Sequence, residues 1–87
     1  MAEKRRSVVH EPEFIDDLSR LIFDDESSLD YIAAAEDLLS REPESGVCVD
    51  AEGLVWFLDL PPIRGRQVGL WYTFDGNTVI FLNVLAT

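Results

Sequence analysis

Cationic side chains are scarce in this sequence. Its 87 residues include 7 Lys and Arg against 17 Asp and Glu, so the net charge is −10 and the pI is near 4.2. Because nucleic-acid affinity comes mainly from Lys and Arg that displace counterions from phosphates, direct nucleic-acid binding is disfavoured. Three explanations of the acidity stay open: a solubilising surface, a surface matched to a basic partner, and adaptation to a salty cytoplasm.

Cysteine and long apolar runs are also nearly absent. The lone Cys48 cannot form a disulfide within the chain and has no His/Cys cluster to join. We expect it to be a small buried apolar residue, and we expect no metal or cofactor. No run of about 18 apolar residues could span a membrane. The start, "MAEKRRSVVH", lacks the apolar stretch of a secretory signal, so we expect a cytoplasmic protein.

Enzymatic motifs are missing as well. His10 is the only histidine, and there is no glycine-rich phosphate loop, nucleophile elbow or thiol with a base nearby in sequence. The many carboxylates are dispersed along the helical segments, where we expect them to be solvated. One basic feature remains in "IRGRQ", where Arg64 and Arg66 flank a glycine. This pair could bind a phosphate or carboxylate, or could balance surface acids such as Asp59.

Two helical patterns fill the first half of the chain. Pro12 suits the first turn of one helix, and the second begins with a capping box at Ser27 and Asp30 and is ended by Pro43 and Gly46. The short connection between them favours an antiparallel helical hairpin. The stripes expected to face the core are Phe14, Ile15, Leu18, Leu21 and Ile22 in the first helix, and Tyr31, Ile32, Ala35, Leu38 and Leu39 in the second.

Alternating β patterns surround the helical hairpin. A short strand is expected at residues 7–10, and further strands at "LVWFLDL" and in the two arms of "LWYTFDGNTVIFL", with "VCV" as a lead-in and turns at "DAEG", "PPIRGR" and "DGN". Short connections between successive strands predict antiparallel pairing. We therefore predict one α+β domain over residues 1–87, in the order β-α-α-β-β-β. The helical hairpin packs on one face of a small, mostly antiparallel sheet, and residues 1–6 are frayed.

Two registers are possible for the hairpin at residues 70–82. A two-residue DG turn is the strongest local signal, but it pairs Tyr72 with Val79 and mixes the two faces. A three-residue DGN loop pairs Tyr72 with Ile80, and we favour it because burial fixes register more firmly than turn preference. The predicted core face then contains Val68, Leu70, Tyr72, Phe74, Thr78, Ile80, Leu82 and Val84.

The opposite face of this hairpin carries Trp71, Val79 and Phe81, which the helices cannot reach in the favoured register. Aromatic patches left open on a small domain mark interaction sites, so this face is a candidate partner-binding or homodimer surface. The alternative is that strand edges and the "PPIRGR" loop fold over it.

The chain resembles the RelE/ParE superfamily of toxins from bacterial and archaeal toxin–antitoxin pairs. The resemblance extends over residues 8–85 and rests on the order "PEFIDDLSRLI", "REPESG" and "PPIRGRQVGLWYTFDGNTVIFLNVL". The most similar piece is the penultimate strand, which contains Tyr72 ahead of an Asp-Gly turn and a final apolar strand. The resemblance implies the α+β fold described above and a cognate antitoxin as partner.

The resemblance implies two different mechanisms. Members that cut mRNA on the ribosome carry an Arg three residues before the tyrosine matched by Tyr72, where this chain has Gly69, and another Arg past the last strand. Only Arg64 and Arg66 fall where such proteins keep basic residues that touch RNA. We therefore favour action by protein–protein binding, as in members that bind DNA gyrase, with the antitoxin on the Trp71 face and no catalytic set. The alternatives are a ribosome-dependent mRNA endonuclease that uses Arg64, Arg66 and Tyr72, and an acidic inhibitor that occupies a basic nucleic-acid channel.

Overall fold

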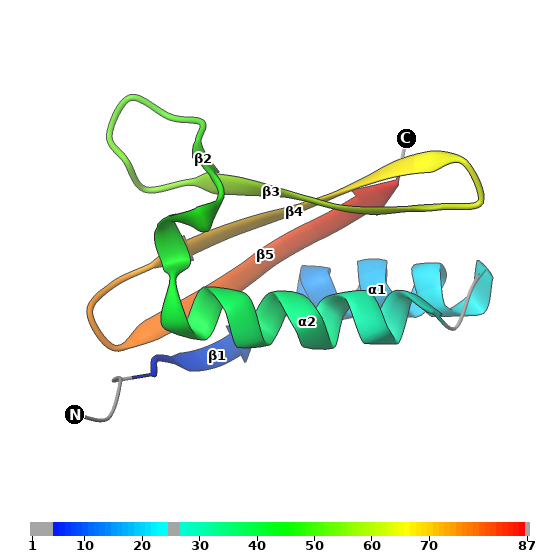
Figure 1. The fold of residues 1–87 in the computed structure, drawn as a ribbon, viewed down its shortest axis with the longest axis horizontal. Coiled ribbons are helices and arrows are strands. Elements are labelled where there is room, and N and C mark those ends of the chain that lie inside the picture. The colour runs from blue at the N-terminus through cyan, green and yellow to red at the C-terminus, as the bar shows by residue number, and fades with distance from the viewer. Residues whose placement is uncertain (1–4, 25–26, 87) are drawn as a thin grey trace.

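The computed structural model describes residues 5–24 and 27–86. Its strands order as β1-β5-β4-β3-β2 in one sheet, antiparallel except for the β1–β5 pair. Both helices lie on one face of that sheet (Figure 1), which confirms the predicted α+β fold. The elements are β1 Ser7–His10, α1 Pro12–Asp24, α2 Ser27–Arg41, the 3-10 turn η1 Pro43–Ser45, β2 Val47–Cys48, β3 Trp56–Ile63, β4 Arg66–Phe74 and β5 Thr78–Ala86.

Most of the predicted helical stripes face the sheet. Phe14 and Leu21 of α1 and Ile32, Ala35 and Leu39 of α2 are buried in one core with the sheet, and Leu18 and Tyr31 pack at its margin. The assignment of Ile15 to the core is wrong, since that side chain is 50% exposed. One position along a helix turns a side chain by about 100°, which takes Ile15 away from Phe14 and out to solvent. The Ile22 side chain lies outside the described part.

Arg5 and Arg6, which were predicted to be frayed, are held against the rest of the fold. Arg5 pairs with Asp37 of α2 at 2.8 Å, and the Arg6 backbone amide donates to the Ser40 carbonyl at 2.9 Å. The Arg6 guanidinium donates to the Asp75 carbonyl at 2.7 Å. Fraying is therefore wrong for these two arginines, and residues 1–4 lie outside the described part.

The favoured register of the β4–β5 hairpin is wrong by one residue. Tyr72 lies opposite Phe81, not Ile80. Asp75 makes the difference, because its carboxylate accepts the amides of Asn77 at 2.7 Å and Thr78 at 2.8 Å, and its own amide donates to the Thr78 carbonyl. This Asx turn lengthens the loop by one residue.

A β-bulge then shifts the register a second time. Pairing passes from Tyr72–Phe81 to Trp71–Asn83, so Leu82 is the extra residue on β5. The bulge reverses the alternation of β5. Val79 and Phe81 face the helices before it, and Val84 faces them after it, all at most 1% exposed. Ile80 and Leu82, which were assigned to the core, are only half-buried.

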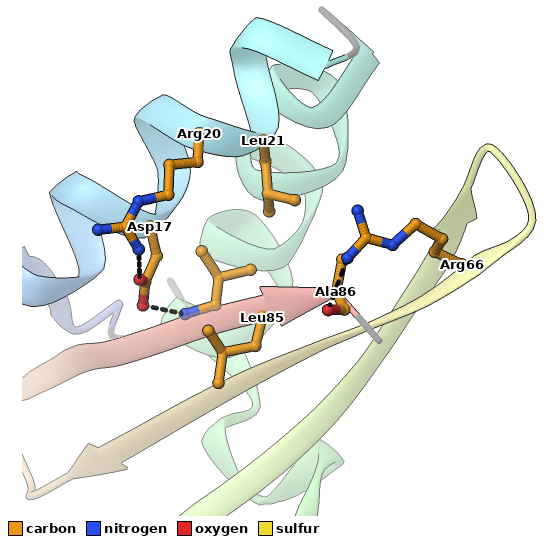
Figure 2. Close-up of a pocket in the computed structure, with 7 residues that line it drawn as sticks. Asp17, Arg20, Leu21, Arg66, Leu85 and Ala86 are labelled. Atoms are coloured by element: carbon orange, nitrogen blue, oxygen red, sulfur yellow. Dashed lines mark hydrogen bonds and ion pairs between the residues drawn. The ribbon is translucent and has the colours of Figure 1, made fainter.

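Asp17 fastens α1 to β5 beside this bulge. It is 6% exposed, so the expectation that all helix carboxylates are solvated is wrong at this position. Its Oδ2 accepts from the Asn83 side-chain amide at 3.3 Å. The same oxygen accepts from the Val84 amide at 3.4 Å, and Oδ1 pairs with Arg20 at 3.2 Å (Figure 2). A buried carboxylate needs such partners, and here the strand irregularity supplies two of them.

The predicted loop "PPIRGR" is a strand end and a tight turn. β3 continues through Ile63, and Arg64 and Gly65 alone form the turn, with φ of 52° and 78°. Two successive positive φ values give a type I′ turn, which matches the twist of the flanking strands. The β3–β4 pairing is irregular between Leu60 and Ile63, where two prolines lack the amide hydrogen of a regular ladder. This turn is too short to cover the far face of the sheet.

The register can be tested by a pair of substitutions in β5. Phe81→Ala should lower the free energy of unfolding by about 3–5 kcal/mol, since the ring is fully buried. Ile80→Ala, one residue away on the far face, should cost clearly less. Urea unfolding of both variants measures the difference, and a larger loss in Ile80→Ala than in Phe81→Ala would restore the rejected register.

Candidate interaction surface

The face of the sheet away from α1 and α2 is the candidate interaction surface. Cross-strand pairing places its members side by side: Phe57 opposite Trp71, Gly69 opposite Leu85, and Thr73 and Val9 beside Ile80. No helix among residues 5–24 and 27–86 packs on it (Figure 1). We call this surface the outer face, and its apolar members are Val9, Val47, Phe57, Trp71, Ile80 and Leu85.

An aromatic pair forms the centre of the outer face. The rings of Phe57 and Trp71 meet edge to face, with centroids 4.7 Å apart and planes at 64°. Gly69 lies beneath the Phe57 ring, where any Cβ would collide with it. A shallow depression of about 90 Å³ opens beside the pair, and Asp59 and Leu85 contribute to its walls. The glycine thus lets the Phe57 ring approach the sheet closely beside Trp71, and both side chains are half-buried.

A protruding segment continues this surface beyond the sheet. Residues 47–55, which we call the arm, expose the aliphatic side chains of Val47, Val49 and Leu54 by 64%, 52% and 57%. The arm stands clear of both helices (Figure 1). Val47 pairs with Phe57, so the arm begins directly beside the aromatic pair.

The arm is ordered by its own hydrogen bonds. The Asp50 carboxylate accepts the amides of Leu54 at 2.8 Å and Val55 at 2.9 Å, which lowers the pKa of that carboxyl. The Trp56 indole donates to the Gly53 carbonyl at 3.1 Å, and Gly53 itself has a φ of 75°. These contacts fix the backbone that presents the aliphatic side chains.

Comparison with known proteins finds similarity in structure only. No family model matches the chain, and no curated protein does. A chain of the RelBE2 toxin–antitoxin complex from Mycobacterium tuberculosis superimposes with a TM-score of 0.73, over 99% of this chain and 95% of that chain. The fold is RelE-like. At 23% sequence identity the similarity establishes the fold alone.

The outer face of this RelE-like fold contains one of the three residues assigned to it. Trp71 lies there as predicted, and its role in partner binding stays a prediction. The placement of Val79 and Phe81 is wrong, because both are fully buried under the helices. Phe57 and Leu85 also lie on the outer face and were not predicted there. The alternation of "LVWFLDL" contained the signal for Phe57, but its use required the register of β3 against β4.

The candidate RNA-contacting residues of a RelE-like nuclease do not form one site. Arg64 and Arg66 lie at the β3–β4 turn, and the Arg66 guanidinium donates to the Ala86 carbonyl at 3.1 Å (Figure 2). Tyr72 is six residues further along β4, about 20 Å away at the usual strand rise. The cavity beside Arg66, of about 220 Å³, also contains Arg20, whose charge is paired with Asp17.

Tyr72 is a structural residue. It is fully buried, and its hydroxyl donates to the Pro43 carbonyl at 2.6 Å and accepts the Gly46 amide at 3.1 Å. Burial raises the pKa of this phenol. The assignment of Tyr72 as an RNA contact is therefore wrong. The side chain instead holds the η1 turn, and with it the base of the arm, against the sheet.

The remaining reactive side chains lie apart from one another. His10 Nε2 bonds Glu36 Oε1 at 2.7 Å, and its ring packs on Phe14 and Phe81. Cys48 is exposed, not buried as expected, and its thiol donates to the Asp50 carbonyl. Within the described residues there is no His, Cys, Asp and Glu cluster able to hold a metal. In the same part of the chain, no helix is long and apolar enough to cross a membrane.

Tyr72→Phe should destabilise the protein by about 1–3 kcal/mol, because a buried carbonyl and a buried amide lose their partner. The raised pKa adds a pH dependence: the folded state holds the phenolic proton more tightly than the unfolded state. This contribution is complete below pH 10 and is lost as the pH rises through the raised pKa. Urea unfolding from pH 8 to 11 should show the alkaline loss in the parent protein and a smaller loss in Tyr72→Phe. Tyr31→Phe, half-buried on α2, is the control and should leave the stability at pH 8 unchanged.

Gly69→Ala tests the close approach beneath the aromatic pair. The added methyl should displace the Phe57 ring and cost about 1–3 kcal/mol by overpacking. Gly76→Ala is the matched control, since a Cβ at that turn position meets no atom within 4 Å. Nuclear Overhauser contacts between the Phe57 ring and the Trp71 indole should weaken in the first variant only. Retention of those contacts in Gly69→Ala would show that the packing is assigned wrongly.

Proposed function

We propose that this chain is the toxin component of a toxin–antitoxin pair and acts through protein–protein binding in the cytoplasm. The support is a RelE-like fold shared over nearly the whole chain with a chain of a toxin–antitoxin complex. The partner is a cognate antitoxin that binds the outer face. DNA gyrase is the cellular target that the resemblance implies for members without a catalytic set.

The observation that carries this proposal is the half-exposed aromatic pair of Phe57 and Trp71 on an uncovered sheet face. Aromatic side chains of this kind provide the binding energy of protein interfaces, because they bury much area and lose little conformational freedom. The exposed aliphatic side chains of Val47 and Leu85 flank the pair. Such a surface suits an apolar segment of a partner.

Ribonuclease activity has weaker support. The position three residues before Tyr72 holds Gly69, whose space is taken by the Phe57 ring, so no larger side chain fits there without rearrangement. Tyr72 is buried, and the net charge of −10 opposes RNA approach. The acidic-inhibitor alternative requires a surface of carboxylates alone, whereas the outer face has an apolar centre.

Co-expression with the protein encoded by the neighbouring open reading frame tests the proposal. The parent chain should co-purify with that protein, and Trp71→Ala should abolish the complex with little change in the urea midpoint. Leu29→Ala is the control, because Leu29 is 49% exposed on the helical side and should have no effect on the complex. Ribosome-dependent mRNA cleavage is measured in parallel, with Arg64→Ala and Arg66→Ala combined in one variant.

The outcomes separate the two mechanisms. Cleavage that is lost in the double arginine variant would establish a nuclease and contradict action by binding alone. A complex that survives Trp71→Ala contradicts the assignment of the outer face. Should Trp71→Ala unfold the protein, Leu85→Ser gives the same test, because this side chain is 46% exposed and leaves the core intact.

A further inference from the structure

The arm and the neighbouring strands contain acidic residues and no basic ones. Between Glu42 and Ile63 the sequence has no Lys or Arg, although it has three carboxylates flanking the arm and two within it. The acidic residues are Glu42, Glu44, Asp50, Glu52 and Asp59. This concentration coincides with the most exposed large aliphatic side chains among the described residues, those of Val47 and Leu54.

One of these carboxylates lines the apolar surface, a second is close in sequence to the exposed Leu54, and neither forms an ion pair with a described residue. Asp59 lies opposite Gly69 and lines the depression beside Phe57 and Trp71. Glu52 is exposed in the arm, two residues from Leu54. No ion pair between described residues includes either of them.

The described arginines form no ion pair with Glu52 or Asp59. Arg64 and Arg66 lie at the β3–β4 turn, at the opposite end of the sheet from the arm (Figure 1). The other arginines contact α1, α2 or the β4–β5 turn. Their contacts are Arg5 and Arg41 with Asp37 at 2.8 and 2.7 Å, Arg20 with Asp17 at 3.2 Å, and Arg6 with the Asp75 carbonyl at 2.7 Å. The negative field of the arm is therefore left for a binding partner to neutralise.

From this arrangement we infer that the arm and the outer face dock an amphipathic, basic segment, with apolar side chains on one side and Lys or Arg along its flanks. The apolar side covers Leu54, Val47 and the Phe57–Trp71 pair, and the basic flanks meet Glu52 and Asp59. The hydrogen bonds that order the arm lower the entropy lost on docking. Two copies of this chain repel at this surface, since both bring the same carboxylates. The identification of the partner as an antitoxin rests on the proposed function. The expected chemistry of the partner, an apolar side with basic flanks, rests on the arm and the outer face alone.

The test uses the intact chain and two synthetic amphipathic helices, one of leucine and lysine and one of leucine and glutamate. Titration calorimetry should show binding of the lysine peptide alone, and its affinity should fall with added salt. Leu54→Ser should weaken binding about tenfold, the change expected when an apolar anchor worth about 1.4 kcal/mol is lost. Combining Glu52→Gln with Asp59→Asn should reduce both the affinity for the lysine peptide and the salt dependence of that affinity. Leu29→Ser and Glu13→Gln, both exposed on the helical side, are the controls and should leave the affinity unchanged.

Several results would overturn the inference. One is binding of the glutamate peptide as tightly as the lysine peptide. A second is an equal loss of affinity in Leu29→Ser and Leu54→Ser. A third is a dimer of the chain that Leu54→Ser dissociates. Failure here is distinct from failure of the proposed function. If the neighbouring gene product co-purifies but the lysine peptide does not bind, only the inference of a basic segment is contradicted. If the lysine peptide binds but no neighbouring gene product co-purifies, the docking chemistry is supported and the toxin–antitoxin assignment is contradicted.

Discussion

The carboxylate of Asp17, buried between α1 and the bulged part of β5, is the contact on which the architecture depends. Without the bulge, a strand of strict alternation could not turn Phe81 and Val84 toward the same helices. The bulge disturbs the regular hydrogen-bond ladder of the sheet, and the Asp17 carboxylate accepts a hydrogen bond from the nearby Val84 amide. α1 is thereby held over both halves of β5, and the opposite side of the sheet is left for the outer face.

Periodicity predicted those parts of the fold that depend on neighbouring residues. The two helices, the strand at residues 7–10 and the hairpin at residues 70–82 follow from spacing, capping residues and a turn signal. The order of the layers follows from short connections. The helical core assignments fail where packing against residues far away in sequence decides the outcome. Ile15 satisfied the helical spacing as well as Phe14 did, and only packing against the sheet separates the two.

Predictions for the candidate surface also succeed where the strand pattern is regular and fail where it is interrupted. Trp71 could be assigned to the outer face because the β4 alternation is regular, whereas β5 has two shifts in register that its own alternation does not report. One comes from the Asp75 carboxylate and its contacts to two following amides, and the other from the extra Leu82. Phe57 could not be added to the surface before β3 and β4 were paired. Tyr72 was predicted on the core face and is buried there. Its candidate role as an RNA contact came from the family resemblance alone, and the contacts of its hydroxyl to Pro43 and Gly46 give it a structural role instead.

The two consecutive prolines of β3 determine how the open side of this sheet can be used. Successive backbone groups of a strand point to alternate sides, so one of Pro61 and Pro62 lacks a donor toward β4 and the other lacks a donor toward the free edge. Beyond the two-residue β2, that edge cannot continue a regular ladder with an incoming strand. The protein therefore resists edge-to-edge aggregation there, despite its apolar sequence. A partner can recognise this molecule through side chains laid across the sheet, but not by extending the sheet along that edge.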